Sequence, residues 1–175
     1  MLTKFFLYFF IPFIFVACSD EYTLIHEDIV TVNKSKLRDD TLLHDTILNS
    51  NFSRLTKPNS YGLESVFKVS DEFKNKQLRI IFKGKGRIDQ VYTKSSIVIA
   101  ILTGDSNKVL IWKAMSLKYA YTDVNQWCWF ADSIEVGPTY LNKTFSYIDV
   151  SPYLGDTQIE KFDMDTLTVQ IKAKL

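Results

Sequence analysis

Aromatic side chains with polar neighbours form the densest group of residues in this sequence that could bind a ligand. They occupy positions between 112 and 129, and side chains able to hydrogen-bond a hydroxylated ligand accompany them. The group comprises Trp112, Lys113, Tyr119, Tyr121, Asp123, Asn125, Trp127 and Trp129. An aromatic plane beside convergent polar groups is what a sugar-binding site needs. The alternative interpretation of Asp123 and Asn125 is an ordinary polar turn.

The direction in which Trp127 and Trp129 point decides whether they form such a plane. On a strand these two side chains share one face, and Cys128 and Phe130 share the other. If Cys128 and Phe130 are core, two indole rings stand outside, about 6.5–7 Å apart, and can stack on sugar rings. If the tryptophans are core, no platform exists. Aromatic residues dominate core energetics, so the sequence favours tryptophans in the core and leaves the platform as the alternative.

The sequence contains none of the common motifs of catalysis or metal binding. There is no Gly-x-Ser-x-Gly elbow, no His-Glu-x-x-His and no cysteine cluster. Cys128 has no histidine nearby to activate it, because His26 and His44 lie far upstream, so we interpret it as a small buried hydrophobe. We therefore predict no enzymatic activity, no catalytic residue, no metal site and no cofactor. Distant strands can still bring two carboxylates together, which keeps a glycan hydrolase as the third hypothesis.

The N-terminus has the order of a secretory signal peptide. Lys4 precedes an unbroken apolar stretch over residues 5–17, and Cys18 follows at once. The stretch is shorter than the roughly 20 residues that a membrane-spanning helix needs. Residues 15–18, Phe-Val-Ala-Cys, resemble the lipobox of bacterial lipoproteins. That resemblance implies cleavage before Cys18, lipidation of this cysteine, and a membrane as partner through the attached lipid.

These features divide the chain into a lipoprotein signal peptide over 1–17, a lipid-anchored polar tether over 18–46 and a β-sandwich domain over 47–175. Within the tether, residues 22–32 have β character and are able to dock as an edge strand. The residues after Cys18 do not resemble the signal that retains lipoproteins in the inner membrane, so we expect the outer membrane. Residues 19–21 resemble an acidic export signal, so both the periplasmic face and the cell surface stay open.

The charge of the chain excludes one class of partner. The formal net charge is +1, and one of the basic residues, Lys4, lies in the signal peptide. Nucleic acids are bound through an excess of lysine and arginine, so we predict no nucleic-acid partner.

Alternation of apolar and polar residues, interrupted by turn residues, predicts an all-β domain. The expected strands cover residues 64–69, 77–82, 96–102, 108–116, 126–136, 146–150 and 167–174. Residues 97–102 are apolar on both faces, so this strand should be central in its sheet. Gly84 and Gly86 suggest a turn over 83–86.

From residue 48 onward the chain also resembles jelly-roll domains of the galactose-binding and carbohydrate-binding-module type. The resemblance lies in residues 47–52 with 60–65, in 96–102 followed by 108–113, and in 125–127 leading into a later strand. It implies a jelly-roll-like β-sandwich that binds glycans. An acidic residue that helps to bind structural calcium often follows the opening Phe in that family; here Ser53 follows Phe52, which leaves calcium in doubt.

The leading hypothesis is a lipid-anchored envelope protein with a non-catalytic glycan-binding module. The alternative is a structural or accessory lipoprotein that binds another envelope protein through a sheet edge or an aromatic patch.

Overall fold

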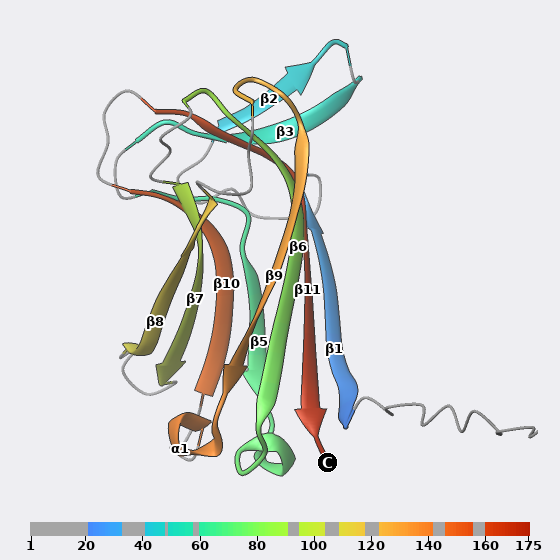
Figure 1. The fold of residues 1–175 in the computed structure, drawn as a ribbon, viewed down its shortest axis with the longest axis vertical. Coiled ribbons are helices and arrows are strands. Elements are labelled where there is room, and N and C mark those ends of the chain that lie inside the picture. Colours follow the sequence, from blue (N-terminus) through green and yellow to red (C-terminus); the bar gives the residue numbers. More distant parts are fainter. Residues whose placement is uncertain are drawn as a thin grey trace, which may run out of the picture.

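Two antiparallel sheets packed face to face form a β-sandwich with a jelly-roll-like topology (Figure 1). The structure, a computed structural model, describes residues 21–32, 41–47, 49–57, 60–90, 95–103, 109–117, 123–141, 146–155 and 160–175. The expected signal peptide over 1–17 lies outside the described residues, as do Cys18, Tyr119 and Tyr121. The fold class predicted from the sequence is confirmed.

Sheet A has six strands, in the order β2-β3-β11-β6-β9, with β1 also paired to β11. Their bounds are β1 (Tyr22–Thr31), β2 (Thr41–Asp45), β3 (Ser50–Leu55), β6 (Leu78–Ile88), β9 (Cys128–Val136) and β11 (Phe162–Lys174). The long strand β11 is paired with β6 along one edge. On its other edge it is paired first with β3 and then with β1.

Sheet B has five strands, in the order β4-β10-β7-β8, with β5 also paired to β10. Their bounds are β4 (Ser60–Tyr61), β5 (Ser65–Val69), β7 (Ser95–Thr103), β8 (Val109–Ser116) and β10 (Ser146–Leu154). Two short helices, η1 (Asp71–Phe73) and α1 (Pro138–Leu141), lie at the lower end in Figure 1, where the chain also ends. Neither of these described helices is long and apolar enough to span a membrane.

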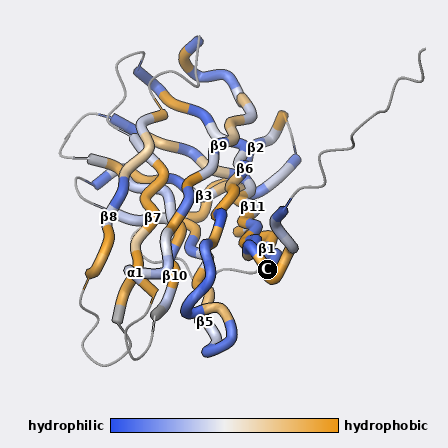
Figure 2. Tube along the Cα trace, turned by 60° about the horizontal axis from the view of Figure 1, so that its bottom comes forward, coloured by the Kyte–Doolittle hydropathy of each residue, from blue (hydrophilic) through white to orange (hydrophobic). Residues whose placement is uncertain are grey.

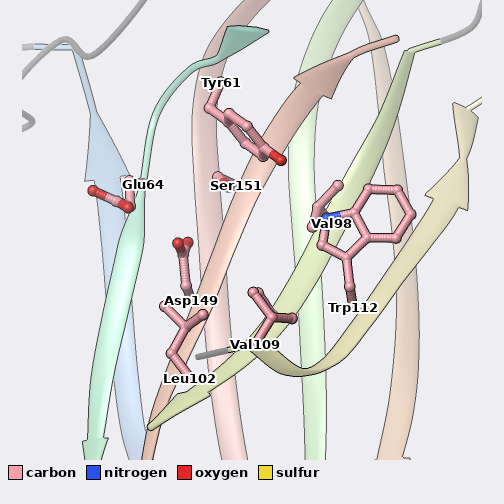
Figure 3. A pocket seen from close by; sticks show the side chains of 9 residues that line it. Tyr61, Glu64, Val98, Leu102, Val109, Trp112, Asp149 and Ser151 are labelled. Atoms are coloured by element: carbon pink, nitrogen blue, oxygen red, sulfur yellow. The ribbon is translucent and has the colours of Figure 1, made fainter. Parts of the chain in front are cut away.

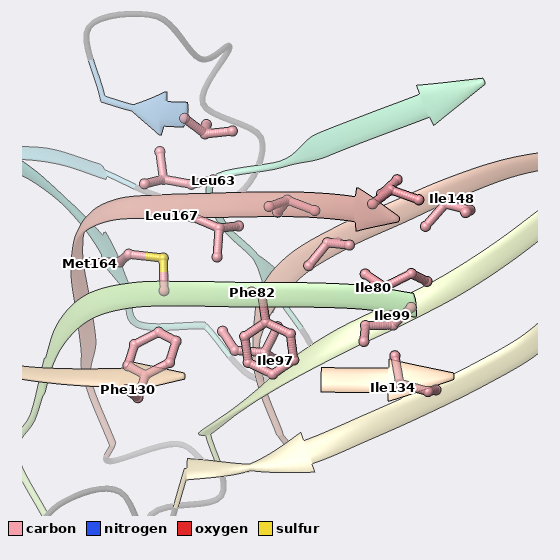
Figure 4. Close-up of a cluster of buried hydrophobic side chains, with 14 of the residues drawn as sticks. Leu63, Ile80, Phe82, Ile97, Ile99, Phe130, Ile134, Ile148, Met164 and Leu167 are labelled. Atoms are coloured by element: carbon pink, nitrogen blue, oxygen red, sulfur yellow. The ribbon is translucent and has the colours of Figure 1, made fainter. Parts of the chain in front are cut away.

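The core consists of the inward-facing side chains of both sheets. On β11 the alternation puts Leu167, Val169 and Ile171 inside, each at most 1 % exposed. They face apolar side chains of β7 and β10, such as Ile99 and Ile148 (Figure 4). Each such side chain contributes roughly 1.5–3 kcal/mol when it is fully buried. Hydrophobic positions accordingly recur along both sheets in Figure 2.

The turn expected over residues 83–86 is wrong, because β6 continues through it to Ile88. Lys83, Lys85 and Arg87 are the outward positions of this strand, and the glycines are inward. Gly84 lies opposite Phe130 of β9, and a Cβ at this position would overlap the Phe130 ring. The glycine therefore makes room for an aromatic ring inside the sandwich.

Strand β1 begins earlier than the expected domain boundary at residue 47. Tyr22 is opposite Lys174 of β11, and the pairing continues to Thr31. The expected docking of this segment as an edge strand is thus confirmed, and strand β2 also lies before residue 47. Docking of β1 covers backbone groups of β11 that would otherwise form an open edge. The His26 ring lies 4.6 Å from the Phe67 ring of β5, which places a contact between the two sheets at this edge.

A buried ionic cluster joins three strands of sheet A at the upper end. Asp163 of β11 is 3 % exposed and accepts two hydrogen bonds from Arg54 of β3, at 2.6 and 2.8 Å. Arg87 of β6 donates two more, at 2.9 and 2.7 Å. The bonds to Asp163 raise the pKa of the Arg54 guanidinium above its ordinary value. A charge at this depth is tolerated because it is paired and fully hydrogen-bonded.

The packing of Phe130 on Gly84 predicts the effect of adding one methyl group. We expect Gly84→Ala to lower the free energy of unfolding by about 1–3 kcal/mol, because the new Cβ overpacks the core. Gly137→Ala is the matched control, since no heavy atom lies within 4 Å of its added Cβ. Urea unfolding of both variants measures the difference. Equal stability of the two variants would contradict the proposed packing.

Candidate functional site

The structure places Trp127 and Trp129 on the outer face of sheet A, with Cys128 and Phe130 toward the core. Phe130 is 6 % exposed, and Cys128 packs against the buried cluster. The sequence favoured the opposite orientation, and that interpretation is wrong. The physical reason is Gly84, which leaves a space on the inner face that Phe130 fills.

The Trp127 side chain is packed against other side chains of the protein and does not present a free ring face. Its Nε1 donates a hydrogen bond to Asp45 Oδ2 at 3.3 Å, and its ring meets the Phe52 ring edge-on at 5.6 Å between centroids. The Arg87 guanidinium lies 4.8 Å from the centre of the indole ring. These contacts fix β2 and β3 to the start of β9, so the pair of stacking indoles in the alternative interpretation is reduced to one.

Trp129 is the more open of the two, with 57 % of its surface exposed. The Lys83 ammonium lies 4.6 Å from its ring centre, which is the distance of a cation–π contact. One face of this indole is therefore partly covered by a lysine of β6.

The other described members of the group predicted from the sequence are not brought together. Asp123 and Asn125 are exposed in the loop before β9, and the Asn125 backbone, at a φ of 59°, donates a hydrogen bond to the Ile88 carbonyl at 2.7 Å. Trp112 lies on sheet B, and Lys113 follows it on the opposite face of β8. The predicted group thus divides between two sheets.

A groove formed by described residues lies on the outer face of sheet B (Figure 3). This groove has a volume of about 450 Å³. Four strands and the segment before β5 contribute to it. Its lining residues are Tyr61, Glu64, Val98, Ala100, Leu102, Val109, Trp112, Asp149 and Ser151.

Small side chains on β7 produce the hollow. Val98 and Ala100 form its floor, between larger side chains on β8 and β10. Ala100 is opposite both Trp112 and Asp149, which places an aromatic ring on one side of it and a carboxylate on the other. Figure 3 shows this arrangement, with Glu64 on the same side as Asp149.

Three aromatic rings contact one another at the upper part of this face. The Trp112 ring extends over β7 to Tyr153 of β10, with centroids 5.9 Å apart and planes at 88°. Tyr153 in turn contacts Tyr61 of β4 at 4.9 Å. Trp112 stays 49 % exposed, so its ring is oriented by these contacts and still presents a surface to solvent.

The polar groups of the groove lie deep within it. Asp149 is 8 % exposed and Ser151 is 1 % exposed, whereas Glu64 is half-buried at the side. Within the described part of the chain, no three His, Cys, Asp or Glu side chains are grouped as metal ligands. The groove therefore presents carboxylate and hydroxyl oxygens beside an indole.

Sequence reasoning missed Tyr61, Glu64, Asp149 and Ser151. One signal was present in β10, where Tyr147, Asp149, Ser151 and Tyr153 alternate with inward-facing residues. The other two residues come from segments that only the pairing of β4 and β5 with β10 brings close.

Comparison with known proteins gives the fold and no family. No family model matches the chain, and no curated protein sequence matches it. Among solved structures, infectious bursal disease virus, Gx strain, has a TM-score of 0.52 at 8 % identity, over 84 % of this chain and 31 % of that chain. The chain thus spans about a third of the length of this viral chain.

Carbohydrate-binding modules are also among the similar structures. A structure described as a CBM4 has a TM-score of 0.39 at 13 % identity, over 80 % of this chain and 84 % of that chain. A family 35 carbohydrate-binding module from Clostridium thermocellum has a TM-score of 0.39 at 10 % identity, over 83 % and 98 % of the two chains. At such identities these likenesses concern the fold alone.

The different environments of the three tryptophans predict their accessibility to a quencher. We expect acrylamide to quench Trp112 and Trp129 readily and Trp127 weakly, because Trp127 is half-buried between Asp45, Phe52 and Arg87. Trp112→Phe and Trp129→Phe should each lower the quenched fraction, and Trp127→Phe should raise it. A Trp127→Phe variant that loses as much quenching as Trp129→Phe would contradict the assignment.

Proposed function

We propose that this protein binds glycans, without catalysis, through the groove on sheet B. The observation that carries this proposal is the combination of an oriented, half-exposed Trp112 with Asp149 and Ser151 in one hollow. Its volume of about 450 Å³ lies in the range of small-molecule sites, roughly 300–1,000 Å³.

The chemistry of the groove suits a sugar ring. A pyranose has apolar C–H faces, which pack on an aromatic plane, and hydroxyl groups at its rim, which donate to carboxylates and exchange hydrogen bonds with a serine. Carboxylate acceptors form the stronger, charge-assisted hydrogen bonds. The contacts of Trp112 with Tyr153 hold the indole in place before binding, which reduces the entropy lost on association.

The sequence-based hypothesis on Trp127 and Trp129 is less favoured by the geometry. Trp127 is occupied by its own structural contacts, and Trp129 is not among the residues that line the groove. The exposure of Trp129 instead supports the second candidate function, contact with another envelope protein.

Binding to a glycan array tests the proposal with two matched tryptophan variants. We expect Trp112→Ala to lower affinity at least tenfold, because the stacking surface is lost, and Trp129→Ala to leave it unchanged. The two residues are similarly exposed, at 49 % and 57 %, so the comparison controls for loss of surface indole. Circular dichroism of both variants checks the fold.

Other outcomes of the same variants separate the alternatives. If Trp129→Ala abolishes co-purification of a defined envelope protein and neither variant affects glycan binding, the accessory-protein hypothesis replaces this one. Release of reducing ends by the unaltered protein, lost in Glu64→Gln, would instead assign a hydrolase.

We also propose that Cys18 is lipidated and anchors the protein in the outer membrane. Tyr22, the first residue of β1, is four residues after Cys18. Four extended residues span at most about 14 Å. The proposed anchor therefore holds the lower end of the sandwich close to the lipid surface.

Metabolic labelling with palmitate tests the anchor. Cys18→Ala should lose the label and shift the protein from the membrane fraction to the soluble fraction. Cys128→Ala is the control, because this half-buried cysteine packs against the core and should leave labelling intact. Retention of the label in Cys18→Ala would refute the anchor.

A further inference from the structure

One side of the sandwich has a free strand edge in each sheet. β8 ends sheet B and β9 ends sheet A, and within the described part of the chain each of them is paired along one edge only. A crevice of about 280 Å³ lies between them, lined by residues 115–117 of β8 and its end, by residues 130–132 of β9, and by Phe82 of β6. Both strands extend from there toward the lower end in Figure 1, so they run in opposite directions. Free edges present backbone groups that can pair with a further strand.

Each of these two edge strands carries one charged side chain on its inner face. Lys113 of β8 is opposite the buried Ile99, and Asp132 of β9 is opposite the buried Phe82, so both charges point to the space between the sheets. Both side chains belong to exposed residues. The neighbouring strands add no charge there, because β7 contains no charged residue and the inward row of β6 is apolar.

The two charges do not neutralise each other within one copy. Packed sheets stand about 10 Å apart. Asp132 Oδ1 accepts a hydrogen bond from the Ser133 backbone N–H at 2.6 Å, and among the described residues no ion pair joins Lys113 to Asp132. A carboxylate accepts several hydrogen bonds, so Asp132 keeps the capacity to bind an ammonium group.

A two-fold axis parallel to the strands would bring opposite charges together. This axis joins sheet B of each copy to sheet A of the other, so β8 meets β9 of the second copy in the antiparallel sense. It also keeps every residue at its level along the strands. Asp132 is level with residues 115–117, so Lys113 comes close to the diagonal position of Asp132 of the second copy. Diagonal neighbours are about 7–8 Å apart, which long side chains can span, and the symmetry makes this contact twice.

The other two-fold arrangement is less favourable. An axis perpendicular to the sheets joins β8 to β8 and β9 to β9, which brings Lys113 toward Lys113 and Asp132 toward Asp132. Like charges on paired strands are destabilising. The signs of the two charges therefore favour the arrangement in which the two kinds of edge meet.

The outer face of both edge strands leaves room for close pairing. Ala114 and Ser116 are the outward residues in the second half of β8, and Ala131 and Ser133 are outward on β9. All four are small and exposed. The apolar crevice behind them, which Met115 and Phe130 help to line, would be covered by the second copy.

We propose that a second copy of this chain pairs with the open side, β8 of each copy beside β9 of the other, in a two-fold symmetric dimer. Inward-pointing charges on free edges can also keep edges apart. Here the two edges carry opposite signs, so they repel an identical edge and attract the other one. The inference is independent of glycan binding in the groove.

The test measures the dimer dissociation constant of the full chain by sedimentation equilibrium in a density-matched detergent. Lys113→Asp and Asp132→Lys each place like charges at both symmetric contacts, so each variant alone should raise this constant at least tenfold. An equimolar mixture of the two variants restores opposite charges at both contacts. We expect it to form a heterodimer with a dissociation constant within threefold of that of the unaltered protein.

Two control variants make the same charge changes elsewhere. Lys57→Asp and Asp71→Lys alter exposed residues outside both edge strands and should leave the dissociation constant unchanged. Recovery in the mixture also serves as a control for folding, because two misfolded variants would not restore a defined heterodimer.

The outcomes separate this inference from the proposed function. A monomer at every concentration would overturn the inference and assign the two charges to protection of the edges. A dimer that neither single variant weakens, or a mixture that does not recover, would also overturn it, because another surface would then be the interface. Glycan binding by such a protein would leave the proposed function intact, and a charge-dependent dimer that binds no glycan would support this inference alone.

Discussion

Burial of one apolar face of each sheet against the other is the interaction on which the rest of this structure depends. The inward-facing residues of β6 and β11 pack with those of β7 and β10 in one buried cluster. Because each sheet packs one face into the core, only its outer face is available to bind a ligand or a partner. Gly84 contributes to it at one point, because the absence of a side chain lets Phe130 enter the core and thereby turns Trp127 and Trp129 outward.

The outer faces of the two sheets differ in the contacts that their charged and aromatic side chains make. On sheet A, Arg54 and Arg87 converge on the buried Asp163, and Trp127 is packed against Phe52 and Arg87. These contacts satisfy the charges within the protein and join β3, β6 and β11. On sheet B, by contrast, Val98 and Ala100 of β7 form the floor of a groove, and the neighbouring strands carry aromatic and acidic side chains. The groove on sheet B thus has the buried Asp149 and Ser151 at its base and the half-exposed Trp112 at its side.

The N-terminal strand links this architecture to the proposed anchor. Because β1 is paired with β11 from Tyr22 onward, a lipid on Cys18 would act on the sandwich through a few residues only. A short linker restricts the orientations that the domain can adopt above a lipid surface, since the lower end stays near it. The groove on sheet B would then lie on the side of the domain, open to polymers that extend along the envelope.

The pattern of strands was determined by the sequence alone, because alternation of apolar and polar residues is a local property. The C-terminal strand and the central position of β7 were both predicted from it. The course of β6 was not, because Gly84 is explained only by Phe130, a residue from a strand distant in sequence. For the same reason the orientation of Trp129 was missed. The groove was decided by tertiary structure, since strand pairing brings Glu64, Trp112 and Asp149 to one face from three separate segments, and no local pattern encodes which strands become neighbours.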